Sequence, residues 1–409
     1  DYVSRLIGLE GFEVTDVLEV GAQLELRVEL TACVGCCPVC ACVSSEVKER
    51  PVVRVRDLPV AGRVTYLCWR KRRFCCRVCR GTFTESHPAI AARQRVTVRF
   101  RGWLLERVRG GGAHAEVARE EQTTRYQVSR AFRESHGQLA ARHAARCPRR
   151  LSFDEAHHRR GRELATVVSD LDRRCVIDVL DGRSRRAVER YLRSLPEQTR
   201  YGIEVVSIDP YDAYRQAIRA ELPWARIVCD RFHLVRGANT ALDSVRRERQ
   251  RQQIHSQPKG TRRSGHTHTW QRSLYNARHR LLKANERLNH HQRSRLCTLF
   301  NEDPIIAEAW GLKEAFRSIY HATDRVHATQ RLEEFLAATD RSGLPAFQSF
   351  ATGIRQWREE LLAYFDEPTT NGYAEGIINK VKVIKRRAYG LPTFTSFQQR
   401  ILLACGEPH

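Results

Sequence analysis

Methionine is missing from this chain of 409 residues, and so are long apolar runs. Because position 1 is aspartate, we expect the natural start to lie outside the sequence. No apolar run reaches the roughly 18 residues that a membrane span needs. The first part of the chain mixes charged and apolar side chains, unlike a signal peptide. We therefore expect a soluble cytoplasmic protein of about two to four domains, with no membrane partner.

Acidic residues and lysine are also scarce. The chain has 47 Asp and Glu against 70 Lys and Arg, which gives a net charge of +23, and only eight of the basic residues are lysine. A surplus of this size attracts polyanions, and the arginine guanidinium binds phosphate through two parallel hydrogen bonds. A GC-rich genome also favours arginine over lysine, but it explains the net charge less well. DNA is therefore the expected partner.

Cysteines are concentrated in one segment. Nine of the 14 lie between Cys33 and Cys79, and they include two Cys-x-x-Cys pairs. Each pair can present two thiolates to a tetrahedral zinc ion, whereas disulfides fit poorly with an intracellular chain. We therefore predict a zinc ribbon with four ligands: Cys37, Cys40, Cys76 and Cys79.

Neighbouring cysteines leave the ligand set open. Cys33 and Cys36 form a rival pair, and Cys75 adjoins the second predicted pair. Pro38 stiffens the turn that follows Cys37, which favours the ligands given above.

Two stretches between the cysteine pairs have the pattern of strands, Val52 to Arg56 and Arg63 to Leu67. We expect them to belong to the small zinc unit. Because such a unit has little core, the metal would supply much of its folding free energy, about 10 kcal/mol or more.

A helix-turn-helix is predicted next. Thr97 to Val108 reads as a helix that ends at three glycines, 110–112. A short helix over 113–121 and a turn at 122–124 lead to a second helix, Arg125 to Ser135. The apolar residues that would pack this pair together are Val117, Ala118, Val128, Ala131 and Phe132. Three side chains would then face the major groove of DNA: Arg125, Gln127 and Arg130. A plain helical connector is the alternative.

From residue 150 the pattern changes to strands and helices in the order βββαβαβ, which is typical of a ribonuclease-H-like core. The first strand contains Asp154, and the fourth ends in Asp209. In that arrangement these two strands are neighbours, so we expect the two carboxylates to lie within a few ångströms of each other. Such a pair repels unless a cation lies between the groups. Two Mg²⁺ ions held there can activate a nucleophile and stabilise the leaving oxygen of an in-line displacement.

A third carboxylate is expected from a late helix. Asn371, Glu375, Asn379 and Lys382 recur on one helix face, with Ile378, Val381 and Ile384 on the buried face. We predict that Glu375 completes the metal site. The helix continues as a basic edge that would grip phosphate, made of Lys382, Lys385, Arg386 and Arg387. A solvated charged helix is the alternative.

At this point the chain resembles the ISL3 family of bacterial insertion-sequence transposases, which are of the DDE type. The resemblance rests on six stretches, in order along nearly the whole chain: Cys37–Cys40, Arg72–Cys79, Phe153–Glu155, Ser207–Asp209, Ile227–His233 and Asn371–Gly390.

The resemblance implies zinc-finger DNA binding and an acid triad carried by Asp154, Asp209 and Glu375, with Mg²⁺ or Mn²⁺ as the catalytic metal and Zn²⁺ as the structural one. It implies DNA partners, the transposon ends and the target, and by analogy a homodimer. Asp230, which ends the fifth strand, and His233 are expected to support the site or to be alternative ligands.

The complete fold prediction is an α/β protein with a ribonuclease-H-like core and a long, mostly helical insertion, preceded by a zinc ribbon and a helix-turn-helix. The expected domains are a zinc ribbon (1–90), a helix-turn-helix (91–149), the first part of the catalytic domain (150–235), the insertion (236–363) and the segment with the third acid (364–409).

Two other functions compete with transposition. A ribonuclease-H-like DNA endonuclease without strand transfer needs the same acids, so only a strand-transfer assay separates the two. A non-catalytic, domesticated DNA-binding protein predicts that loss of the acids changes nothing in the cell.

Binding to DNA ends should weaken steeply as salt rises, because each arginine–phosphate contact releases counterions. With six or more such contacts, the affinity should fall about a thousandfold or more between about 50 and 200 mM salt. Titration of an end duplex at several salt concentrations measures this slope. A flat dependence would contradict the inference from charge.

Overall fold

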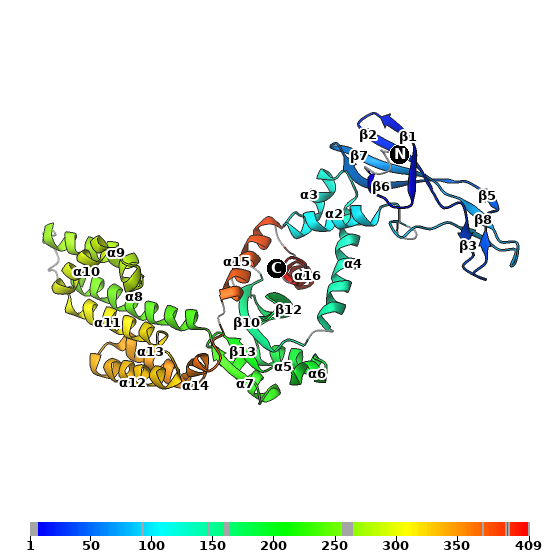
Figure 1. Cartoon of the computed structure of the whole chain (residues 1–409). Coiled ribbons are helices and arrows are strands. Elements are labelled where there is room, and N and C mark those ends of the chain that lie inside the picture. Colours follow the sequence, from blue (N-terminus) through cyan, green and yellow to red (C-terminus); the bar gives the residue numbers. More distant parts are fainter. Residues whose placement is uncertain are drawn as a thin grey trace. The chain divides into compact units, whose positions relative to one another are not determined.

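The computed structural model describes residues 7–90, 94–144, 147–158, 163–255, 265–369, 372–388, 391 and 393–407 (Figure 1). The chain forms two compact units. The first comprises residues 1–142 and 383–404, and the second comprises 143–382 and 405–409. Both contain helices and strands, so the protein is a mixed α/β protein.

The first unit contains a four-stranded sheet in the order β1-β2-β7-β6. Its strands are β1 (Phe12–Val20), β2 (Gln23–Leu30), β6 (Val52–Val60) and β7 (Arg63–Arg70). β2 and β7 are parallel, and the other neighbours are antiparallel. Leu67 and Trp69 alternate with less buried residues, so they lie on one face, where they meet Leu26 and Val28 in a hydrophobic core.

The cysteine-rich turns belong to two smaller sheets. One pairs β3 (Gly35–Cys36) with β4 (Val43–Ser44), and the other has the order β5 (Val47–Glu49), β8 (Arg73–Cys75), β9 (Thr82–Thr84). The two stretches predicted to be strands are β6 and β7. They pair with β1 and β2, which precede the first cysteine, and share a hydrophobic core with them.

Four helices complete the first unit: α2 (Val98–Arg109), α3 (His114–Glu120), α4 (Arg125–Ala144) and α16 (Phe394–Cys405). Thr97 caps α2 by accepting a hydrogen bond from the Phe100 backbone N–H. The residues predicted to pack α3 on α4 are all buried, which confirms that part of the prediction. Their cluster also includes Leu403 of α16. α4 continues to Ala144, well beyond the predicted end at Ser135.

The second unit is built on a five-stranded sheet in the order β12-β11-β10-β13-β14. The strands are β10 (Arg150–His157), β11 (Leu164–Asp170), β12 (Cys175–Asp181), β13 (Val205–Ile208) and β14 (Arg226–Cys229). β10, β11 and β12 are antiparallel neighbours, whereas β10, β13 and β14 run parallel. The expected adjacency of the first and fourth strands is thereby confirmed.

One face of this sheet is covered by α5 (Arg185–Ser194) and α7 (Asp212–Glu221), and a short helix, α6 (Glu197–Tyr201), follows α5. Phe153 of β10 is fully buried there, with its ring centroid 6.3 Å from Tyr191 of α5 and 6.0 Å from Tyr214 of α7. Because side chains alternate along a strand, the next residue, Asp154, is directed to the other face.

The region between the sheet and the last helices is helical, as predicted. Its elements are α8 (Arg231–His255), α9 (Gly265–Leu282), η1 (Asn285–Arg287), α10 (His290–Glu302), α11 (Pro304–Ile319), α12 (Arg325–Ser342), α13 (Pro345–Gln356), α14 (Arg358–Leu362) and η2 (Ala363–Phe365). Within the described part of the chain, no helix is apolar over the length that crossing a lipid bilayer requires.

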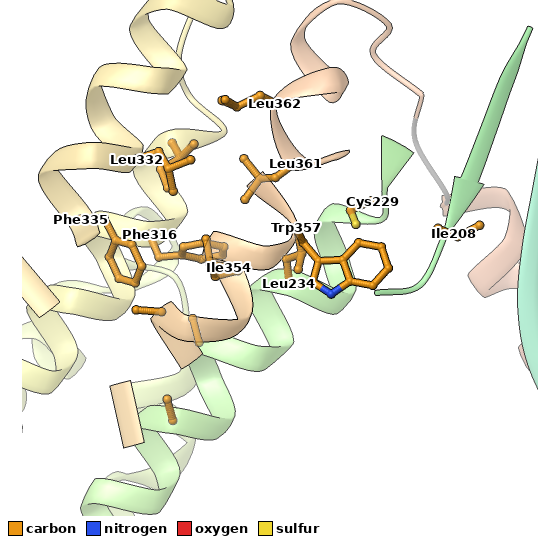
Figure 2. Close-up of a cluster of buried hydrophobic side chains, with 14 of the residues drawn as sticks. Ile208, Cys229, Leu234, Phe316, Leu332, Phe335, Ile354, Trp357, Leu361 and Leu362 are labelled. Atoms are coloured by element: carbon orange, nitrogen blue, oxygen red, sulfur yellow. The ribbon is translucent and has the colours of Figure 1, made fainter. Parts of the chain in front are cut away.

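Aromatic and aliphatic side chains join these helices to the sheet. Phe316 of α11 and Phe335 of α12 are buried with their ring centroids 5.2 Å apart. Figure 2 shows the Trp357 indole between these helices and the strand ends that carry Ile208 and Cys229. The helical region therefore shares one continuous core with the sheet.

Phe335→Ala should lower the free energy of unfolding of the helical region by about 3–5 kcal/mol, because it leaves a cavity between α11, α12 and α13. Hydrogen exchange of the α12 amides measures this loss. Val326→Ala on the same helix is the control: Val326 is 78% exposed, so a change below about 0.5 kcal/mol is expected. Equal losses in the two variants would contradict the assignment of Phe335 to the core.

Candidate catalytic site and metal centre

Four cysteines converge in the first unit. The sulfur atoms of Cys37, Cys40, Cys76 and Cys79 all lie within 4.8 Å of one another. The Cys37 and Cys79 sulfurs are 3.6 Å apart, and those of Cys40 and Cys76 are 3.5 Å apart. Zinc–sulfur bonds of about 2.3 Å in a tetrahedron place sulfurs roughly 3.8 Å apart. The cluster therefore fits a structural zinc ion.

The two cysteine turns have the same backbone design. The N–H of Cys37 donates to the carbonyl oxygen of Cys42, and that of Cys76 donates to Gly81. Each turn includes a non-glycine residue at positive φ, Ala41 at 60° and Arg80 at 56°. Such residues are strained, and a bound metal would compensate for the strain.

Backbone N–H groups in the two turns donate hydrogen bonds to the sulfurs of Cys37 and Cys76. The N–H groups of Cys79 and Val78 donate to the Cys76 sulfur and lower its pKa to about 7, although burial opposes the shift. The amides of Cys40 and Val39 lower the pKa of Cys37 in the same way. Zinc binds thiolates, so these hydrogen bonds favour the ligand form of Cys37 and Cys76. The pKa of Cys40 is instead raised to about 12, because hydrogen bonds with other cluster sulfurs and burial outweigh the Cys42 backbone N–H, and that of Cys79 is also raised.

The rival cysteines lie outside the cluster. Cys36 is exposed, and its thiol lies 3.2 Å from the Ala41 carbonyl oxygen, while Cys33 is also exposed. Cys75 precedes a cluster member, but on a strand successive side chains point to opposite faces. Its sulfur is not among the four that converge.

Three aspartates form a row in the second unit. The strand register pairs Phe153 with Ile208 and Ile208 with Cys229. The next residue on each strand is an aspartate: Asp154 still within β10, Asp209 directly after β13, and Asp230 directly after β14. The N–H of Asp230 donates to the Ile208 carbonyl oxygen at 2.9 Å, which continues the ladder and aligns the row.

His233 lies against two of these carboxylates. It is in the first turn of α8, and its Nδ1 is 2.7 Å from Asp209 Oδ1 and 2.8 Å from Asp230 Oδ2. Burial disfavours its charge, but its hydrogen bond with Asp230 and its close contact with the Asp209 carboxylate raise the pKa of His233 to about 10. The imidazole is therefore charged at neutral pH.

Asp154 shows that the row remains electrostatically strained. Burial raises the pKa of Asp154 to about 7, and the charge of Asp209 adds to the shift, although the Glu155 backbone N–H and His233 oppose it. Asp209 Oδ1 is buried and has no hydrogen bond of acceptable geometry with any described residue, although His233 lies close to it. A strongly raised pKa of a buried carboxyl group beside other charged groups is typical of functional sites.

Glu375, the third predicted acid, is not among the ligand atoms that lie within 4.8 Å of one another in the described residues, and neither is Asp154. Glu375 is exposed in the first turn of α15 (Gly372–Arg387). Among the described residues, the second set of ligand atoms within 4.8 Å consists of Asp209, Asp230 and His233. Ile377, Val381 and Ile384 form the buried face of α15, and the expected Ile378 is only half-buried. Asn371 lies outside the described residues.

The four basic residues predicted to hold phosphate on α15 differ in their exposure and contacts. Lys382 and Arg386 are exposed, and burial lowers the pKa of Lys385. Arg387 donates to the Gly110 carbonyl oxygen at 2.7 Å, so it anchors the turn that follows α2.

On α4, the three residues predicted to meet DNA differ in exposure. Arg125 is exposed, whereas Gln127 and Arg130 are half-buried, with Gln127 held by Thr123 and Arg130 by Glu134.

Asp230 and His233, which the sequence analysis expects to support the site or to be alternative ligands, lie together with Asp209. The signal that could have found them is their spacing. Asp230 follows a strand parallel to the one that ends in Asp209, and His233 comes three residues later, within one helical turn.

A cluster of four cysteines in one unit and a row of three aspartates on neighbouring parallel strands of the other define the class of protein, a DNA-processing enzyme. The model of a transposase family of the ISL3 type matches residues 151–401. A second model matches residues 34–79 and describes the zinc-finger of transposase IS204/IS1001/IS1096/IS1165. The chain therefore belongs to the ISL3 family of transposases.

Individual relatives agree with this family. The transposase for insertion sequence element IS1001 of Bordetella parapertussis is 28% identical over 397 residues, which cover 95% of this chain and 94% of the relative. The transposase for insertion sequence element IS1557 from two strains of Mycobacterium tuberculosis is 28% identical over 268 residues, 63% of this chain and 59% of the relative.

Cys76→Ser should abolish zinc binding, because a tetrahedral site loses one of its four thiolates. Cys75→Ser, at the adjacent position, should retain it. Zinc content by mass spectrometry separates the two variants, and hydrogen exchange should show faster exchange in β5, β8 and β9 of Cys76→Ser but not in β6 and β7, which have their own core. Loss of zinc from both variants would overturn the ligand assignment.

Proposed function

We propose that this transposase binds the ends of an insertion sequence and catalyses metal-dependent strand cleavage and strand transfer. The observation that carries the proposal is the row of Asp154, Asp209 and Asp230 on three neighbouring parallel strands, with the raised pKa of Asp154. Groups of like charge at this spacing need a cation, and phosphodiester chemistry uses divalent cations held in this way.

We further propose that the second unit is a ribonuclease-H-like core and that α3 and α4 are a helix-turn-helix. The strand order and the parallel pairing of β10 with β13 support the first assignment. The short α3, the turn before Arg125 and the packed residues between the two helices support the second.

The acid row fits magnesium or manganese, because both ions prefer oxygen ligands. Asp154 and Asp209 would hold the metal, and Glu375 is the proposed third ligand. When bound, the ions would polarise the phosphodiester and lower the pKa of the attacking water. Asp230 and His233 would orient Asp209, since the imidazolium lies between the two carboxylates.

The chain's own groups would position the DNA for two in-line displacements. In the first, water attacks phosphorus at an element end, and the 3′ oxygen leaves as a hydroxyl. In the second, that hydroxyl attacks a target phosphodiester and displaces a second 3′ oxygen. Lys382, Lys385, Arg386 and Arg387 would hold backbone phosphates of the bound DNA. Because an element has two ends, we propose that a homodimer performs the reaction.

Asp209→Asn should abolish cleavage of an end duplex in Mg²⁺ while leaving end binding intact. Its activity should fall by more than the roughly 10–100-fold that follows loss of a group that only supports a ligand. Cleavage and strand transfer on a labelled duplex, together with a gel-shift titration, measure both properties. Asp172→Asn, in the hairpin at the opposite end of β10, is the control with a carboxylate lost outside the site.

Two further variants separate the roles of the remaining acids. Glu375→Gln should match Asp209→Asn if Glu375 is a ligand, and Asp230→Asn should lose about 10–100-fold if it supports Asp209. The reverse order would make Asp230 the third ligand. Wild-type cleavage by Asp209→Asn would refute the catalytic proposal, and cleavage without strand transfer by the unaltered protein would indicate an endonuclease.

A further inference from the structure

A cavity of about 390 Å³ lies in the first unit between α3, α4 and α16. Its polar lining includes His114 of α3, Arg125, Ser129 and Arg133 of α4, and Gln399 and Arg400 of α16. None of the lining residues that the structure describes is acidic. Three guanidinium groups therefore border one cavity with no carboxylate among them.

Arg400 is the most deeply buried of the three. It is 5% exposed, and it donates to the carbonyl oxygens of Val108 at 3.0 Å and Gly112 at 2.7 Å. Both partners are neutral, and across the described residues no carboxylate comes within 4 Å of this guanidinium. An arginine stays charged when buried, so its charge remains uncompensated within the protein.

Arg125 and Arg133 reach the cavity from a single helix. They are separated by two helical turns, with Ser129 between them, so the three side chains lie on one face of α4. Both arginines are exposed, and neither forms an ion pair with any carboxylate in the part of the chain that the structure describes. Most other arginines that form side-chain contacts in the described part of this unit pair with glutamate or aspartate, as Arg107 does with Glu120.

The pKa of His114 reflects the electrostatic potential inside the cavity. Its Nδ1 is 3.1 Å from the Ser129 hydroxyl, and its ring packs edge-on against Phe132 with centroids 5.0 Å apart. Burial, together with the positive charges of Arg400 and Arg125, lowers the pKa of His114 to about 4. The charged groups that face this imidazole are thus all positive.

We propose that this cavity binds a phosphate group and that the backbone of element-end DNA supplies it. Arginines that converge without a carboxylate form a site for a phosphate oxygen cluster, and Ser129 and Gln399 add neutral donors. Arg125 also begins the helix proposed to meet DNA, so one phosphate there would lie beside the bases that this helix reads. The DNA source rests on the proposed function, and it makes α16, at the end of the chain, part of the DNA-binding unit.

The first test uses the full-length, zinc-loaded protein and inorganic phosphate. NMR of histidine ring protons, with the His114 signal assigned by its loss in His114→Gln, follows the pKa of that imidazole. Bound phosphate should raise this pKa from about 4 toward the ordinary value near 6.5, because an anion favours the imidazolium. An unchanged pKa at saturating phosphate would overturn the proposal.

Arg133→Gln should weaken phosphate binding at least about tenfold, because it removes a charge-assisted hydrogen bond. The side chain of Arg133 is exposed and forms no ion pair, so its loss should not disturb folding. Arg119→Gln is the matched control: Arg119 is exposed on α3, the helix that carries His114, but does not line the cavity. Equal weakening by the two variants would show a general charge effect and overturn the site.

The second test distinguishes the two sources of phosphate. An end duplex should raise the His114 pKa as inorganic phosphate does, and Arg133→Gln should reduce the slope of log affinity against log salt by about one. If inorganic phosphate shifts His114 but the duplex does not, the cavity takes a free phosphate compound and the DNA source is wrong. Neither result depends on cleavage, so an inactive enzyme would leave this proposal standing.

Discussion

In the second unit, three aspartate carboxylates lie side by side on neighbouring parallel strands, and their like charges repel one another. β10, β13 and β14 run parallel and in register, so their aspartates arrive together at strand spacings of about 4.8 Å. His233 reduces the conflict, because its Nδ1 lies within 2.8 Å of both Asp209 and Asp230. Within the described part of the chain Asp154 has no such partner, and burial together with the charge of Asp209 raises its pKa to about 7. Under the proposed function, divalent cations would offset this charge.

The same edge connects the site to the rest of the unit. Phe153, Ile208 and Cys229 immediately precede the three aspartates, and all three are fully buried in the core below. The helical insertion begins directly after Asp230, with α8, and returns to the strand ends through Trp357 (Figure 2). The positions of the carboxylates are therefore set by a large hydrophobic core, and the insertion contributes to that core as well as separating the first acids from α15 along the chain.

The first unit is stabilised in two different ways. The four-stranded sheet and the α2–α4 helices have apolar cores that need no metal, whereas the cysteine turns are short, strained at Ala41 and Arg80, and organised around four sulfurs. Its helical part is completed by residues from the far end of the chain. Arg387 and Arg400 bond to carbonyl groups at the end of α2 and in the turn before α3, and Leu403 joins the helix core. The proposed DNA-binding surface thus includes residues from segments that are far apart in the sequence.

The sequence predicts the cysteine pairs and the order of strands and helices, because these depend on local signals. The cysteine spacing identified the pairs that converge, and the alternation of strands and helices after residue 150 identified the order of elements and the adjacency of β10 and β13. These predictions succeed because ligand spacing, hydrophobic periodicity and strand order act over short distances. The ISL3 resemblance extended them to the whole chain.

Tertiary structure decided the rest. Three features depend on contacts between residues far apart in sequence. They are the pairing of β6 and β7 with β1 and β2, the close contact of His233 with two carboxylates, and the packing of α16 against α2–α4. Spacing in the sequence could not show that ligand atoms of Asp209, Asp230 and His233 lie within 4.8 Å of one another. Nor could it show that Arg400 lines the same cavity as Arg125 and Arg133. Side chains from separate segments share a site only after a core has brought their backbones together, and that core is a property of the whole fold.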